Sequence, residues 1–193
     1  MPGSGVALGT GVEIAWDSFA WDDLAPAGYV VTLDVSTGAF VPAAEPRHDV
    51  TLRAGFALKL SSTAVLGGQL VTEAVSAGNV NHSLLLSSWQ EVRGLTDSFY
   101  RNQAQVTGNV ELRQAWRFAE RSALQGVLFA DAAAFTPFDA HGQAGPAASA
   151  LGVGGGVRLI PTLIANVGPR LDVGRLLVPE RHWFVQVGLA QFF

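Results

Sequence analysis

Residues 106–118 read VTGNVELRQAWRF, and their side chains alternate in polarity along the stretch. Successive side chains of a strand point to opposite faces, so one face here is apolar and the other is polar. The apolar face carries Val106, Gly108, Val110, Leu112, Trp116 and Phe118, and the polar face carries Thr107, Asn109, Glu111, Arg113 and Arg117. The same two-faced pattern recurs in most later segments. This is typical of a barrel whose outside meets lipid and whose inside meets water.

The composition agrees with this interpretation. The chain has 193 residues, 49% of them hydrophobic, enough for one domain with a full-sized core. No apolar run approaches the ~20 residues that a membrane helix needs. The net charge of −4 argues against a nucleic-acid partner. The chain has no Cys, which excludes disulfides and thiol catalysis and suits an oxidising periplasm.

The alternation predicts an all-β fold, an antiparallel transmembrane β-barrel of about eight strands per chain, with short turns at one end and long loops at the other. The expected strands are 28–40, 48–60, 63–75, 104–119, 122–135, 149–160, 162–176 and 182–193. They make residues 28–193 one barrel domain. Residues 1–27 are expected to be a periplasmic lead-in or a lumen segment, with a ninth strand or an amphipathic helix over 6–19 as alternatives.

The alternation alone leaves open a soluble lipocalin-like barrel with its apolar face inside. Two features favour the lipid-facing arrangement. The aromatic residues Tyr29, Trp116, Phe118 and Trp183 fall near strand ends on the apolar face, as in a membrane belt. The polar faces hold charges of both signs, which can pair across a lumen. We therefore expect a bacterial outer-membrane location, with a signal peptide removed from the chain.

Three motifs follow one another along the second half of the chain. The first is Val92-Arg93-Gly94-Leu95, within the long polar stretch 76–103. The second is residues 109–113, NVELR, and the third is residues 126–131, GVLFAD. In this order, they resemble the outer-membrane assembly and secretion superfamily, which contains the barrel-assembly insertase and the two-partner-secretion transporters. The resemblance covers about residues 17–193 and the C-terminal half of the family's barrel.

The resemblance implies specific roles for these motifs. In the superfamily, the loop with the Val-Arg-Gly-aromatic motif folds back into the lumen. This chain has Leu95 in place of the aromatic residue. Arg93 would meet the acid of a neighbouring strand, Asp131. The loop-anchoring strand positions would be Glu111, Arg113, Gly126, Phe129 and Asp131. The last strand resembles the C-terminal signal read by the assembly machinery, carried by Trp183, Leu189 and Phe193. Members of this superfamily have about twice as many strands as this chain is expected to have. They usually also carry N-terminal periplasmic domains.

The function expected from the resemblance is insertion or translocation of protein or lipid, or local bilayer perturbation, through the lumen loop and a strand seam. The alternative is a passive small channel or a structural outer-membrane barrel. The expected partners are membrane lipid, a separate periplasmic substrate-binding protein and a second copy of the chain. A homodimer is expected because free strand edges at 28–40 and 182–193 cannot face lipid. The 76–103 loop also does not fit a closed eight-stranded lumen.

Nothing in the sequence predicts an enzyme. The four histidines, His48, His82, His141 and His182, fall at expected strand ends or in loops. Adjacent strand residues face opposite ways, so no nucleophile–base pair is preassembled. No histidine and carboxylate spacing favours a metal. Residues 152–156 lack the Lys and Ser/Thr of a phosphate loop, and their glycines favour curvature or close packing in a strand. We expect no cofactor and no metal.

Overall fold

The computed structural model describes residues 6–20, 24–41, 45–76, 83–86, 91–95, 100–120, 122–138, 143–161 and 168–189. These residues form one antiparallel sheet of ten strands. None of the described residues belongs to a helix that could cross a membrane. The strands are β1 (Val6–Asp17), β2 (Gly28–Val41), β3 (Glu45–Lys59), β4 (Ala64–Ser76), β5 (Leu84–Leu86), β6 (Tyr100–Ala119), β7 (Ser122–Pro137), β8 (Ala148–Pro161), β9 (Arg170–Val178) and β10 (His182–Gly188).

The sheet is a meander. Its hydrogen-bonded order is β1-β2-β3-β4-β6-β7-β8-β9-β10, and the short β5 pairs with β6 to one side of this path. In the described part of the chain β1 and β10 each have one neighbour, so they are the two edges. Every adjacent pair along the nine-strand path is antiparallel. The two edge strands therefore run in the same direction.

The expected antiparallel all-β fold is confirmed, with ten strands in place of about eight. The segment assigned to a lead-in or lumen element contains β1, which pairs with β2 along its whole length, from Val6 opposite Val41 to Asp17 opposite Val30. The helix alternative is therefore wrong for this segment, and the ninth-strand alternative is confirmed. Strand 28–40 is consequently not an edge, because it pairs with both β1 and β3. The other addition, β5, has three residues and is too short to leave a periodic signal.

The two faces of the sheet have opposite polarity, as the alternation predicts. One face exposes large apolar side chains along nearly every strand, such as Val110 and Leu112 of β6 and Val185 and Val187 of β10. The other face buries polar and charged side chains. They include Asn102, Gln105, Thr107, Asn109, Glu111, Arg113, Gln125, Asp131, Arg158, Arg170 and Asp172. In a soluble protein the apolar face of a sheet is buried and the polar face is exposed. In this sheet the apolar face is exposed and the polar face is buried.

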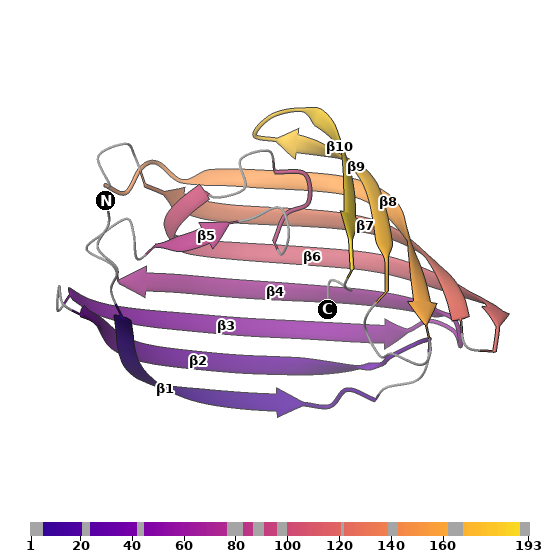
Figure 1. The fold of residues 1–193 in the computed structure, drawn as a ribbon, viewed down its shortest axis with the longest axis horizontal. Coiled ribbons are helices and arrows are strands. Elements are labelled where there is room, and N and C mark those ends of the chain that lie inside the picture. Colours follow the sequence, from indigo (N-terminus) through magenta and orange to yellow (C-terminus); the bar gives the residue numbers. More distant parts are fainter. Residues whose placement is uncertain are drawn as a thin grey trace.

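The sheet curls, so that β9 and β10 turn across its polar side (Figure 1). We call the polar side the concave face and the apolar side the convex face. The connection between β1 and β2 also covers part of the concave face. Leu24 packs against Ala115 and Ala123, at the end of the sheet where β6 turns into β7, and Ala25 packs against Ala57 and Val65 of β3 and β4.

Candidate functional site

Residues 91–95 lie on the concave face within the curl of the sheet. Val92 and Leu95 are fully or nearly buried in an apolar cluster that also contains Leu86 of β5, Phe135 of β7 and Leu176 of β9. These apolar anchors flank Arg93 and Gly94 on both sides. Burial of Val92 and Leu95 therefore holds the loop against the sheet and fixes the backbone position of Arg93.

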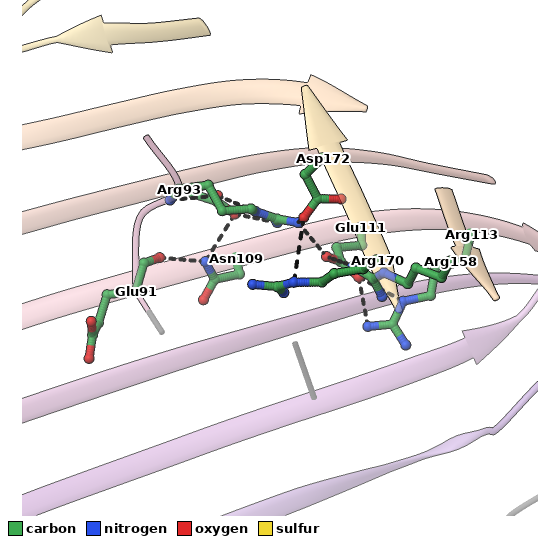
Figure 2. A network of polar contacts seen from close by, with 9 residues as sticks. Glu91, Arg93, Asn109, Glu111, Arg113, Arg158, Arg170 and Asp172 are labelled. Carbon is green, nitrogen blue, oxygen red and sulfur yellow. Dashed lines mark hydrogen bonds and ion pairs between the residues drawn. The ribbon is translucent and has the colours of Figure 1, made fainter. Parts of the chain in front are cut away.

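Arg93 is fully buried and binds two carboxylates from two strands (Figure 2). Its Nε and Nη2 donate to the two carboxylate oxygens of Asp131 on β7, both at 2.7 Å. Its Nη1 donates to Oε1 of Glu111 on β6 at 2.8 Å. The backbone N–H of Arg93 also donates to Asp131, at 3.2 Å. The planar guanidinium fork matches a carboxylate in this two-point geometry, which a lysine cannot reproduce.

The Arg93 guanidinium also stacks on an aromatic ring. Its central carbon lies 3.5 Å from the centroid of the Phe129 ring, a distance at which a cation is attracted to the ring face. The Phe129 ring in turn lies 6.3 Å from that of Phe184 on β10. The charged head of Arg93 is therefore enclosed by carboxylates at its edge and by an aromatic ring on its face.

A second layer of polar contacts satisfies the two acids. Asn109 Nδ2 donates to Asp131 Oδ1 at 3.0 Å and to the backbone oxygen of Glu91 at 2.7 Å. Glu111 accepts from Arg113 Nε at 2.7 Å and from Arg158 Nη2 at 2.6 Å. Asp172 of β9 lies 3.5 Å from Arg93 Nη1. Charges this deep are tolerated only when paired and hydrogen-bonded, and the network meets that condition for Arg93, Asp131 and Glu111.

Glycines of β8 make room for this network. Gly152, Gly154 and Gly156 share one side of the strand with the buried Arg158. A Cβ on Gly152 would lie 3.0 Å from the backbone oxygen of Arg93, and one on Gly154 would lie 2.5 Å from the Phe129 ring. A Cβ on Gly156 would collide with the Asp172 carboxylate. Of the two explanations that the sequence favoured for these glycines, curvature and close packing, the structure shows close packing.

The loop also contacts the edge strand β10. Gly94 has a φ of +85°, in the left-handed region where glycine carries no Cβ penalty. Its backbone oxygen lies 2.8 Å from His182 Nε2, and a Cβ at Gly94 would collide with the ring of Phe184. The five-residue loop therefore connects β6, β7 and β9 to the edge strand.

The structure brings most of the expected site residues together. Arg93 contacts Glu111, Phe129 and Asp131, and Arg113 pairs with Glu111. Val92 and Leu95 pack in the adjoining apolar cluster. The expected ion pair between Arg93 and Asp131 is confirmed.

One expected loop-anchoring residue and the expected assembly signal lie outside this network. Gly126 is on the convex side of β7, where a Cβ would lie 3.1 Å from the Trp116 ring, so it does not anchor the loop. Trp183 and Leu189 were expected in the C-terminal assembly signal and not at the loop, and both are exposed, each at 71%. Phe193 lies outside the described residues.

Sequence reasoning missed several members of the network. Asn109 was recognisable, because it shares a strand face with Glu111. Arg158 and Asp172 lie on the polar faces of the expected strands 149–160 and 162–176, but nothing in the sequence links them to Arg93. His182 and Phe184 could not be linked to Gly94, because the curl that brings β10 over the loop has no local sequence signal. The described residues contain no group of three or more potential metal ligands.

Comparison with known proteins adds no assignment. No protein-family model matches the chain, and no curated protein matches it.

Proposed function

We propose that the chain is an outer-membrane β-barrel of the assembly and secretion type, which inserts or translocates protein or lipid, or perturbs the bilayer locally, at a strand seam controlled by the 91–95 loop. The observation that carries this proposal is the set of contacts that Arg93 makes with Asp131, Glu111 and Phe129, which we call the Arg93 clamp. The clamp lies on the buried polar face of a sheet whose apolar face is exposed. A convex face of exposed Val, Leu and aromatic side chains suits lipid, and a buried charged interior suits a lumen.

The aromatic residues support a membrane position. Trp16 and Tyr29 contact each other edge to face at 5.6 Å between ring centroids. They lie where β1 ends and β2 begins, and the exposed Trp116 and Phe118 lie at the same end of the sheet, where β6 ends. Trp183 lies at the opposite end, at the start of β10. Aromatic residues concentrate at both interfaces of a membrane protein.

The seam is the edge of β10. A strand edge offers unpaired N–H and C=O groups that cannot remain in hydrocarbon, so it can pair with a client strand or a partner strand. Contacts of Gly94 with His182 and Phe184 couple the loop to this edge. Docking of Arg93 therefore holds β10 in one position, and release of the loop frees it. The partners that follow from this function are membrane lipid, a second copy and a separate periplasmic protein that delivers the client.

Location is the first test. The protein, expressed behind a signal peptide, is expected in the outer-membrane fraction, and the refolded protein is expected to show a compact form on SDS gels before boiling. Recovery as a soluble monomer without detergent contradicts the proposal.

Activity is the second test. Liposomes carrying the wild type are expected to take up an unfolded model barrel protein, or to exchange a fluorescent lipid between leaflets, faster than liposomes carrying Arg93→Ala. Arg175→Ala is the matched control, because Arg175 is an exposed arginine on β9 that lies over the Trp183 ring and outside the clamp. A steady ion conductance in planar bilayers with no acceleration in either assay supports the passive-channel alternative instead.

A further inference from the structure

A cavity of about 360 Å³ lies on the concave face over β2, β3 and β4, to one side of the Arg93 clamp. Its floor contains Val30, Gly55 and Ala57, and its lining is mostly apolar. Gly55 keeps the floor open, because a Cβ there would have only the Val30 side chain closer than 3.6 Å. Small-molecule sites have volumes of about 300–1,000 Å³ and mainly apolar linings. The cavity therefore has the size and the lining of such a site.

The segment between β1 and β2 forms a wall at one end of this cavity. Phe19 and Pro26 line the cavity from this segment. Phe19 packs against the buried cluster that contains Ala57. Ala20 and Ala27 pair through two backbone hydrogen bonds, of 2.7 and 3.1 Å. This end of the cavity is therefore held in place by the chain itself, through packing and hydrogen bonds.

Polar side chains lie toward the other end of the cavity. Arg53 of β3 and Thr32 of β2 are directly opposite each other, and both line the cavity together with Gln69 of β4. The Thr32 and Gln69 side chains form no hydrogen bond with the described residues. The Arg53 side chain is 55% exposed, and its Nη2 lies 3.7 Å from Glu73, too far for a hydrogen bond. Three groups that can donate hydrogen bonds are thus available to a ligand at this end.

Two further charged residues line the cavity, Asp17 and Arg113. Arg113 is engaged by Glu111, which accepts from its Nε at 2.7 Å. Asp17 accepts the N–H of Phe19 at 2.7 Å, and its negative charge disfavours a second anionic group in the cavity. The charges of the lining therefore favour a ligand with one negative charge, placed at Arg53.

We propose that this cavity binds an amphipathic monoanion, with an aliphatic chain of medium length along the apolar floor and a carboxylate at Arg53. The planar guanidinium matches a carboxylate in a two-point geometry, and the Thr32 hydroxyl and the Gln69 amide can donate to the same group. Arg53 and Ala57 are four residues apart along β3, about 13 Å, which leaves room for the chain between the carboxylate and the wall. This proposal does not rest on the function proposed above.

Equilibrium dialysis tests the binding. The purified wild type in detergent is dialysed against radiolabelled octanoate, and the linear uptake by micelles is subtracted. One octanoate per chain is expected to bind saturably. Radiolabelled 1-octanol has the same chain length without the charge. It is expected to bind roughly tenfold more weakly or less, because it lacks the charge-assisted hydrogen bonds to Arg53.

Two variants test the two parts of the site. Arg53→Gln removes the charge and is expected to weaken octanoate binding roughly tenfold or more while leaving octanol binding unchanged. Gly55→Leu fills the floor and is expected to abolish binding of both ligands. Arg47→Gln is the matched control for Arg53→Gln, because Arg47 lies on the same side of β3 and pairs with Asp49 outside this cavity. It is expected to bind octanoate as the wild type does.

Saturable octanoate binding that Arg53→Gln and Gly55→Leu lose and Arg47→Gln keeps supports the site. The site is overturned by absence of saturable binding in the wild type, by octanol that binds as tightly as octanoate, or by undiminished octanoate binding in Arg53→Gln or Gly55→Leu. The comparison of octanoate with octanol uses the wild type alone, so it decides the question even if a variant does not fold.

Discussion

At the scale of single residues, Arg93 has the largest consequence, because it neutralises two acids from two strands. Arg93→Ala leaves Asp131 and Glu111 buried with the weaker compensation of Asn109, Arg113 and Arg158. Breaking one side of a buried ion pair costs about 3–5 kcal/mol. We expect the free energy of unfolding in urea to fall by about this amount. Because the strand ladder does not depend on Arg93, limited proteolysis is expected to cut the 77–99 connection well before it cuts the strands.

Two variants test whether the cost belongs to the clamp. Arg93→Lys keeps the charge but cannot donate to both oxygens of Asp131 and to Glu111 together, so most of the loss is expected to remain. Arg175→Ala is expected to change the free energy of unfolding by less than about 1 kcal/mol, as for an exposed site. Equal losses for Arg93→Ala and Arg175→Ala would mean that the clamp contributes nothing specific.

Gly94 is the second decisive residue of the loop. Gly94→Ala introduces a Cβ at a positive φ, where L-residues are strained, and against the ring of Phe184. We expect a loss of about 2–4 kcal/mol of unfolding free energy. Adding Phe184→Ala removes the collision but not the strain, so recovery should be partial. Gly108→Ala is the control, because its Cβ would have no neighbour closer than 3.9 Å. A loss as small as that of the control would show that the loop can shift without cost.

At the scale of strands, sequence periodicity predicted the elements that have a repeating pattern and missed those without one. Each of the eight expected strands has a counterpart, because alternation of apolar and polar side chains is a local property, but β9 begins at Arg170, eight residues after the expected start. β1 shows the same alternation, with Leu8, Val12, Ile14 and Trp16 exposed. This alternation agrees with the ninth-strand alternative for residues 6–19, which the structure confirms. The network around Arg93 was predictable only through the motif, because its members come from separate strands.

At the scale of strands, the testable prediction concerns the side of β8 that holds Gly152, Gly154 and Gly156. Gly154→Ala places a methyl group 2.5 Å from the Phe129 ring and the Val173 backbone. It is expected to cost about 1–3 kcal/mol by overpacking and, by displacing Phe129, to release the Arg93 stack. Gly155→Ala, on the other side of the strand, has its closest atom at 3.1 Å and is expected to cost less. A protease-sensitive 77–99 connection in Gly154→Ala alone confirms the link, whereas equal sensitivity in both variants excludes it.

At the scale of the whole molecule, the strand count decides how the sheet can be completed. Nine strands along the path make the edges β1 and β10 run in the same direction. A chain that closed on itself would therefore need a parallel seam. Two copies related by an axis along the membrane normal would also meet in parallel seams, because this axis preserves strand direction. A parallel pair is slightly less stable per residue than an antiparallel one, so either seam is a weak line suited to opening.

The homodimer remains our prediction, because at the proposed membrane location the two edges of this sheet cannot be left in lipid and twofold dimers are the commonest assembly. The chain has no cysteine, so introduced pairs report without background. Glu13→Cys on β1 and Gln186→Cys on β10 both lie on the concave side of their strands, opposite Asp34 and Asp172. Mixed single variants are expected to form a disulfide-linked dimer, and the double variant a dimer linked at both seams. As the control, Ser36→Cys on the interior strand β2 is mixed with Gln186→Cys in place of Glu13→Cys. This mixture is expected to form no disulfide-linked dimer. A double variant that links only within one chain, with a monomer mass in detergent, would show that the sheet closes on itself through a single parallel seam.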